Sequence, residues 1–174
     1  RDSGMGIRVF RGLESEYLYS ADVREEKVLG LLKEHQGTGG VFGKRTPLST
    51  IKPHGITLQG MLPRDMKLKK KIYLLQEALK EGKSAADCVV QGRACYMDAD
   101  QRVQIGNTQG VYAEDRRVRT RVRFTMVAAD EKSDSRQTGF LGPGAMQGPE
   151  FLQTEAFMEH AKRAARSAKG MLGA

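Results

Sequence analysis

Residues 110–124 read GVYAEDRRVRTRVRF, and from Val118 onward small or apolar side chains alternate strictly with arginines. Side chains of a strand point to opposite faces with a period of two, so this alternation predicts an extended segment over residues 117–130. One face of this strand would carry Val118, Thr120, Val122, Phe124 and Met126. The other would carry Arg119, Arg121 and Arg123, each about 7 Å from the next. We therefore expect a half-buried strand with a basic outer face.

Three interpretations of the arginine row remain open. The arginines could lie in solvent or pair with carboxylates of neighbouring strands, they could contact a peptide or protein partner, or they could follow the phosphates of a nucleic acid. Cross-strand pairs of opposite charge contribute about 0.2–1 kcal/mol each, and the candidate carboxylates are Asp98, Asp100, Glu114 and Asp115. Aromatic side chains that stack on bases are not expected beside the arginines, because Phe124 points to the opposite face. The pattern favours a solvated or salt-bridged face, and nucleic acid is the least favoured partner.

The remaining chain predicts an α+β fold, with a largely antiparallel sheet and helices packed on one face. Further strands are expected at 5–12, 15–20, 87–97, 102–106, 111–115 and 135–141, and helices at 21–37, 64–82 and 154–172. The sequence NTQG at 107–110 is typical of a hairpin turn, because Asn and Gly tolerate the backbone angles that such a turn needs. The order strand, strand, helix occurs twice, at 5–35 and at 118–172.

Two of the helices have faces that the periodicity assigns. In the 64–82 helix we expect a buried stripe of Leu68, Ile72, Leu75 and Leu79, an end at Gly82, and a solvated cluster of Lys67, Lys69, Lys70 and Lys71. An acidic partner for these lysines is the alternative. In the 154–172 helix the expected inner face is Phe157, Ala161, Ala164, Ala168 and Leu172. Residues 37–64 are rich in Gly and Pro and predict a long connection whose role stays open.

No pattern of catalytic or metal-binding residues stands out. His35, His54 and His160 fall on separate elements, and none lies in a spacing typical of a zinc site. Cys88 and Cys95 are seven residues apart and would face opposite sides of a strand, so we expect two buried thiols in a reducing cytoplasm. No apolar run approaches the roughly 20 residues of a membrane span, so no membrane partner is expected. The net charge of +8 is compatible with an acidic partner.

Several stretches together resemble a known family. SGMGIRVFRG, VQIGNTQGVYAEDRRVRTRVRFTMVA, RQTGF and AFMEHAKRAARSAKGML, in this order, are similar to the amino-terminal domain of the TldD/PmbA family. Its members were once described as modulators of DNA gyrase and are now regarded as metallopeptidases. The resemblance implies that the intact protein is a zinc metallopeptidase. The HExxxH motif of the family is not among residues 1–174, which we expect to be an incomplete amino-terminal domain that binds no zinc and is inactive alone.

The resemblance also implies partners. TldD-like and PmbA-like chains pair around an enclosed cavity in which unfolded or extended peptides are cut. We therefore expect a peptide substrate and either a PmbA-like subunit or a second copy of this chain, in the cytoplasm. The expected peptide or partner contacts are Asn107, Thr108, Gly110, Tyr112, Arg119, Arg121 and Arg123. The alternative function is a basic binding module for nucleic acid or an acidic protein.

Overall fold

The computed structural model describes residues 2–34, 47–51, 60–130 and 132–173. His35, His54 and most of the 37–64 connection lie outside this part of the chain. The chain divides into two compact units, Arg1–Arg45 and Thr46–Ala174. Both units mix helices with antiparallel strands, which confirms the predicted α+β class. None of the described helices combines the length and the apolar character that a membrane span requires.

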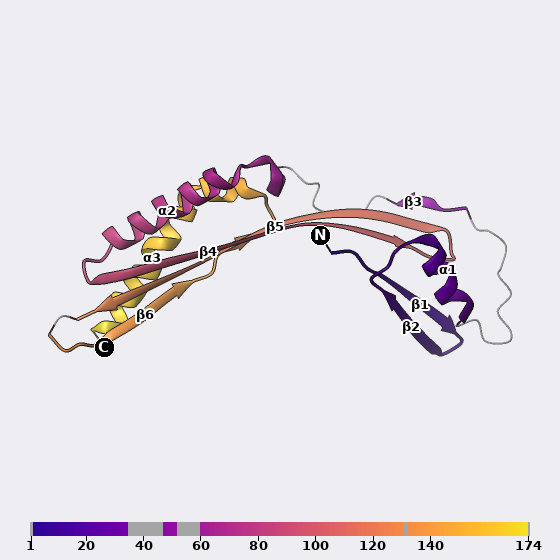
Figure 1. Cartoon of the computed structure of the whole chain (residues 1–174), viewed down its shortest axis with the longest axis horizontal. Helices are drawn as coiled ribbons and strands as arrows, with labels where there is room; N and C mark the ends of the chain where they lie inside the picture. The colour runs from indigo at the N-terminus through magenta and orange to yellow at the C-terminus, as the bar shows by residue number, and fades with distance from the viewer. Residues whose placement is uncertain (1, 35–46, 52–59, 131, 174) are drawn as a thin grey trace. The chain divides into compact units, whose positions relative to one another are not determined.

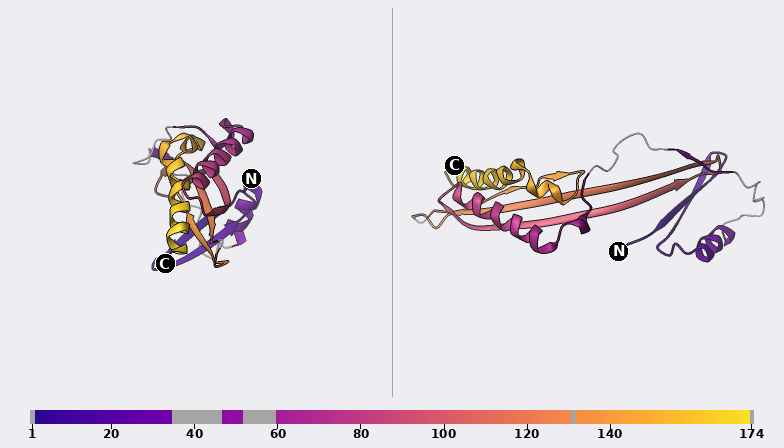
Figure 2. Two further views of the ribbon diagram at one scale, coloured as in Figure 1. Left: turned by 90° about the vertical axis from the view of Figure 1, so that its left-hand side faces the viewer. Right: turned by 90° about the horizontal axis from the view of Figure 1, so that it is seen from above.

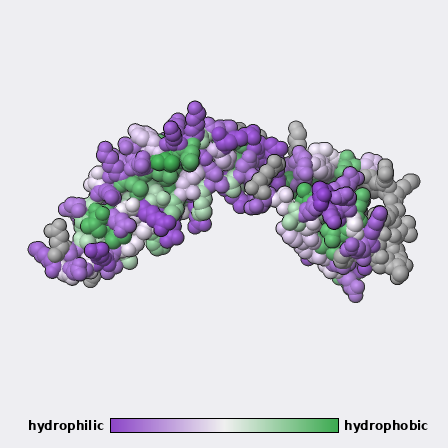
Figure 3. Space-filling view, viewed as in Figure 1, coloured by the Kyte–Doolittle hydropathy of each residue, from purple (hydrophilic) through white to green (hydrophobic). Residues whose placement is uncertain are grey.

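The first unit is a two-stranded hairpin followed by a helix, as predicted. Strands β1 (Met5–Arg11) and β2 (Glu14–Ser20) are antiparallel, and helix α1 spans Glu25–Glu34. Gly12 supplies the turn with a φ of 62°, a left-handed angle that glycine adopts without strain. Leu18 is buried on one face of the hairpin, whereas Phe10, Tyr17 and Tyr19 are exposed on the other. Hydrophobic residues consequently reach the surface of this unit (Figure 3).

The second unit is built on two long antiparallel strands, β4 (Val89–Gly106) and β5 (Val111–Ala129) (Figure 1). On the far side of β5 lie β6 (Arg136–Leu141) and β7 (Gly144–Ala145), both antiparallel to it. The short strand β3 (Ser49–Ile51) also pairs with β5, and this pairing is parallel. The sheet is therefore largely antiparallel, as the sequence predicted.

The strands β4 and β5 are longer than predicted. The segments 87–97 and 102–106 belong to one strand, and so do 111–115 and 117–130. The polar residues between them, Asp98–Gln101, pair residue by residue with Arg117–Thr120. Their carboxylates find cationic partners on neighbouring elements, so the polar composition does not interrupt the strand. Beyond the helices, β4 and β5 continue as a two-stranded arm towards β3 (Figure 2).

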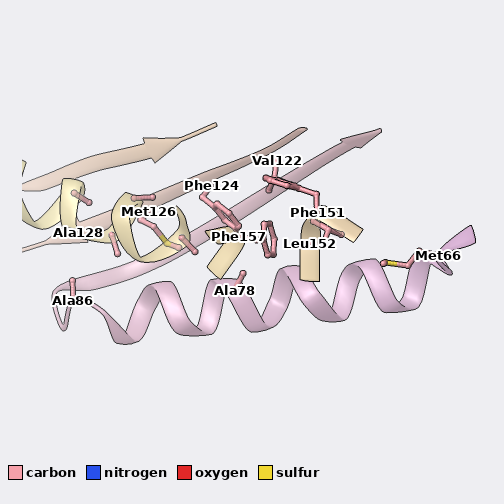
Figure 4. Close-up of a cluster of buried hydrophobic side chains, with 14 residues drawn as sticks. Met66, Ala78, Ala86, Val122, Phe124, Met126, Ala128, Phe151, Leu152 and Phe157 are labelled. Atoms are coloured by element: carbon pink, nitrogen blue, oxygen red, sulfur yellow. The ribbon is translucent and has the colours of Figure 1, made fainter. Parts of the chain in front are cut away.

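Helices α2 (Leu68–Ser84) and α3 (Glu155–Leu172) cover one face of the sheet. Each follows a short 3-10 helix, η1 (Pro63–Asp65) and η2 (Pro149–Gln153). The predicted alternation of β5 is confirmed, because its even-numbered residues from Val118 to Ala128 are buried. The core centres on Phe157, whose ring lies 5.3 Å from that of Phe124 and 6.0 Å from that of Phe151 (Figure 4). The predicted inner face of α3 is also confirmed.

The predicted buried stripe of α2 is wrong in its first half. Leu68 and Ile72 are exposed, and only Leu75 and Leu79 pack against the core. The buried positions are Lys71, Ala78 and Gly82. Ala78 and Gly82 are small and let the helix approach the sheet closely, whereas Lys71 is buried in an ion pair with Asp98. At Gly82 the helix lies against the Met126 side chain and the backbone of Ala161. Gly82 is therefore a packing position inside the helix, which ends two residues later at Ser84.

Candidate interaction surfaces on the long hairpin

The turn of the β4–β5 hairpin uses most of its polar groups internally. The side-chain oxygen of Asn107 accepts hydrogen bonds from the backbone N–H groups of Gln109 and Val111, both at 3.0 Å. Gly110 has a φ of 90°, which a residue with a side chain rarely adopts. Its carbonyl accepts a hydrogen bond from the N–H of Ser49 at 2.6 Å. The NTQG turn is therefore confirmed, and the structure explains Asn107 and Gly110 by the turn itself.

Polar side chains next to the turn hold one face of the arm together. Tyr112 donates a hydrogen bond to Glu114, which also accepts one from Gln104 at 2.5 Å. The hydrogen bond between Tyr112 and Glu114 raises the pKa of the Tyr112 hydroxyl and lowers the pKa of Glu114. Nearby, the guanidinium of Arg116 binds both carboxylate oxygens of Asp100, at 2.7 and 2.5 Å, and keeps the pKa of that carboxyl below its ordinary value. These contacts replace packing in a two-stranded ribbon that has little core of its own.

The arginine row, which we define as Arg119, Arg121 and Arg123, is exposed on the face of β5 away from the helices. The carboxylates expected to pair with it are engaged elsewhere. Asp98 binds Lys71, Asp100 binds Arg116, and Asp115 binds Arg117; Glu114 binds Tyr112 and Gln104. Within the described ranges, no carboxylate lies within ion-pair distance of the row. Its charges are therefore available to a partner.

The seven predicted contact residues form two surfaces. Asn107, Thr108, Gly110 and Tyr112 lie at the end of the hairpin, which we call the hairpin tip. Arg119 lies seven positions after Tyr112 on β5, a distance of about 23 Å. The row then continues for about 13 Å further from the tip. One small ligand cannot reach both surfaces, whereas an extended chain can.

Four residues of the arginine face were not predicted from the sequence. Arg93 and Met97 on β4 and Arg136 and Phe140 on β6 share this face, because they lie opposite odd-numbered residues of β5. All four side chains are exposed. The ring of Phe140 lies 5.8 Å from the guanidinium of Arg123. The expectation of a face without aromatic residues is thus wrong, because the strand register that brings Phe140 there was not predicted from the sequence.

A buried ion pair beneath α2 was not predicted from the sequence. The amino group of Lys71, predicted to be solvated, lies 2.5 Å from Asp98 and 2.8 Å from the carbonyl oxygen of Pro63. Tyr96 donates a hydrogen bond to the same carboxylate oxygen at 2.8 Å. Burial raises the pKa of the Tyr96 hydroxyl, and the bond to Asp98 raises it further. This cluster ties α2 and η1 to β4, and we assign it to structure.

Zinc, which the family resemblance implies, does not fit the donors that the structure describes. No cluster of three or more His, Cys, Asp or Glu side chains has the arrangement of a metal site within those residues. Cys88 and Cys95 are free and half-buried. His160 stands on α3, where burial lowers the pKa of its imidazole.

The edge of β4 is the most extensive backbone surface of the unit. Within the described residues β4 pairs only with β5, along its 18 residues apart from a register shift between Val89 and Gln91. The N–H and C=O groups on its other side, along the arm from Ala99 to Gly106, pair with no strand among the described residues. An unpaired edge of this kind is a template for another extended chain.

Comparisons with known proteins agree with this fold. Residues 62–172 match the family model described as the PmbA/TldA metallopeptidase central domain, whereas the resemblance noted from the sequence was to an amino-terminal domain. Among solved structures, a protein described as a candidate modulator of a DNA gyrase from Thermotoga maritima is similar, with a TM-score of 0.69 and 19% identity. The likeness covers 98% of this chain and 38% of that protein. No curated protein matches the chain.

Proposed function

Because the chain belongs to the PmbA/TldD metallopeptidase family, we propose that it forms the scaffold and part of the substrate cavity of a zinc peptidase. The substrates would be unfolded or extended peptides. The zinc ligands and the residues that hydrolyse the peptide would belong to another part of the protein. In this proposal the chain contributes binding and shape, and the metal contributes the polarised carbonyl and the activated water.

The observation that supports this role is the free edge of β4. An extended peptide can add to such an edge through backbone hydrogen bonds, which depend little on the peptide sequence. A peptidase of broad specificity needs this kind of recognition. The arm from Ala99 to Gly106 is the best candidate, since α2 and α3 do not cover it (Figure 2). The hairpin tip lies at the end of this arm and would then form one boundary of the peptide site.

The partners follow from the same proposal. A PmbA-like subunit, or a second copy of this chain, would close the cavity on the side that the edge of β4 faces. We place the protein in the cytoplasm, where unfolded chains are abundant. The alternative of a basic binding module rests on the arginine row, a different surface, and is developed below.

Hydrogen exchange tests the role of the β4 edge. With an unfolded peptide at ten times its dissociation constant, we expect the outward amides of Ala99–Gly106 to exchange about tenfold more slowly. Amides in α3 should not change. The control is the same peptide with alternate backbone nitrogens methylated, which removes the donors that an added strand needs. Equal binding of the methylated peptide, or protection confined to α3, would show that the edge is not the site.

A further inference from the structure

The sheet of the second unit has one face that none of the described elements of this unit covers. We call it the open face, and its side chains come from the odd-numbered residues of β5 and the residues paired with them. The cations of this face are Arg93, Arg117, Arg119, Arg121, Arg123 and Arg136. Met97 lies opposite Arg121 on β4, and Phe140 lies opposite Thr125 on β6. Two large apolar side chains, exposed by 55% and 66%, therefore flank the arginines on either side.

A solvated face is ordinary for an antiparallel sheet, so exposure alone is no argument. The distribution of charge is the argument. Among the described residues of the open face the one carboxylate is Asp115, and it is already paired with Arg117 at 2.6 Å. The remaining five arginines have no carboxylate within ion-pair distance in the described chain. By contrast, the helix-side residues Asp98 and Asp100 are both neutralised. The open face thus carries five arginines without a described ion-pair partner, and its one described carboxylate is already engaged.

We propose that the open face binds an acidic protein segment. Its carboxylates would pair with the arginine row, and its apolar side chains would pack beside Met97 and Phe140. This site lies on the face of the sheet and goes beyond the proposed function, which uses the edge of β4.

The composition of the open face fits a protein partner. All six of its cations are arginines, although the chain has many lysines elsewhere. Arginine binds carboxylates in a bidentate manner, and arginine, methionine and phenylalanine are enriched at protein interfaces where lysine is depleted. A second copy of this chain would bring a like-charged face, so it is not the occupant that charge complementarity selects.

Nucleic acid fits this face less well. Single-stranded nucleic acids bind through several aromatic side chains on which successive bases stack. On the open face Phe140 is the one aromatic residue of the described strands, and Arg123 already lies against its ring. The arginines also lie on three neighbouring strands, as the register shows. They form a patch that suits the side chains of a protein segment.

The test uses a labelled peptide of glutamates with leucine at every fourth position, and fluorescence anisotropy at low and physiological salt. Reversal of the row by Arg119→Glu, Arg121→Glu and Arg123→Glu should weaken binding by on the order of a hundredfold, since each exposed pair contributes about a factor of five. The neutral set Arg119→Gln, Arg121→Gln and Arg123→Gln should weaken it about tenfold and serves if the reversed protein does not fold. Met97→Ser with Phe140→Ser should remove the preference for leucine over serine in the peptide.

The matched control is Lys69→Glu, Lys70→Glu and Arg163→Glu, which changes the net charge equally on exposed positions of α2 and α3. Its effect should stay within about threefold. An equal loss in the control would overturn the proposal, because binding would then follow net charge alone. Unchanged affinity in both row variants would overturn it as well. So would tighter, row-dependent binding of oligothymidylate of the same charge, which would assign the face to nucleic acid. None of these outcomes depends on the β4 edge.

Discussion

Replacing Lys71 by methionine is expected to lower the free energy of unfolding by about 3 kcal/mol, the low end of the range for breaking a buried ion pair. The side chains of Lys71 and Asp98 are only 10% and 24% exposed, so the surviving carboxylate would lack its partner in a poorly solvated place. Asp98→Ala should cost a similar amount, because it leaves the lysine with the Pro63 carbonyl alone. Both values are measured by urea unfolding.

The double variant Lys71→Met with Asp98→Ala measures the interaction energy between the two side chains. It leaves no unpaired charge, so its loss should fall short of the sum of the single losses by about 2 kcal/mol. Lys169→Ala provides the control, because Lys169 and Asp87 form an ion pair that is 57% and 91% exposed and should change stability little. Additive single losses would mean that Lys71 and Asp98 do not interact in solution.

Gly139→Val should destabilise the second unit by about 3 kcal/mol, the upper part of the range for overpacking. Gly139 lies on β6 directly beneath α3. A Cβ atom there would overlap the backbone of Ala164 and Ala168. Backbone atoms cannot rotate aside as a side chain can, so the helix must shift away from the sheet. The measurement is the midpoint of thermal unfolding, which should fall by roughly 10 °C.

Gly170→Ala is the control, because Gly170 lies on α3, the helix that packs on Gly139. A Cβ atom at Gly170 meets no atom within 4 Å. Alanine also loses less conformational freedom than glycine on folding into a helix, so this variant should be slightly more stable than the natural chain. If Gly139→Val unfolded at the same temperature as the natural chain, α3 would not rest on β6 as the structure has it.

Periodicity predicted the local faces of this protein well. The alternation from Val118 to Met126 predicted which side chains of β5 are buried, and the spacing of Phe157 with three alanines predicted the inner face of α3. Both signals are strong because packing repeats over many turns or pleats. On α2 the apolar spacing misled for Leu68 and Ile72, since the buried positions there are Lys71, Ala78 and Gly82. Lys71 is buried because Asp98, far away in sequence, meets it, and no local pattern contains that information.

The candidate surfaces likewise depend on contacts between residues that are far apart in sequence. The arginine row was visible in the sequence, because one strand contains all of it. The absence of ion-pair partners for the row within the described chain was not visible, because the partners of Asp98 and Asp100 depend on the position of α2 and on the register between strands. The position of Phe140 on this face was not visible either, because it depends on the register between β5 and β6. The separation of the hairpin tip from the row follows from the length of β5, whose two halves the sequence pattern predicts as separate strands.

The most direct measurement of the central proposal is hydrolysis of an unfolded, fluorescently quenched peptide in the presence and absence of zinc. It should compare this chain with a longer family chain that contains the HExxxH motif. The account predicts zinc-dependent cleavage by the longer chain and no cleavage by residues 1–174, even when the peptide binds. Zinc-dependent cleavage by residues 1–174 alone would contradict it, because hydrolysis would then not need the HExxxH motif.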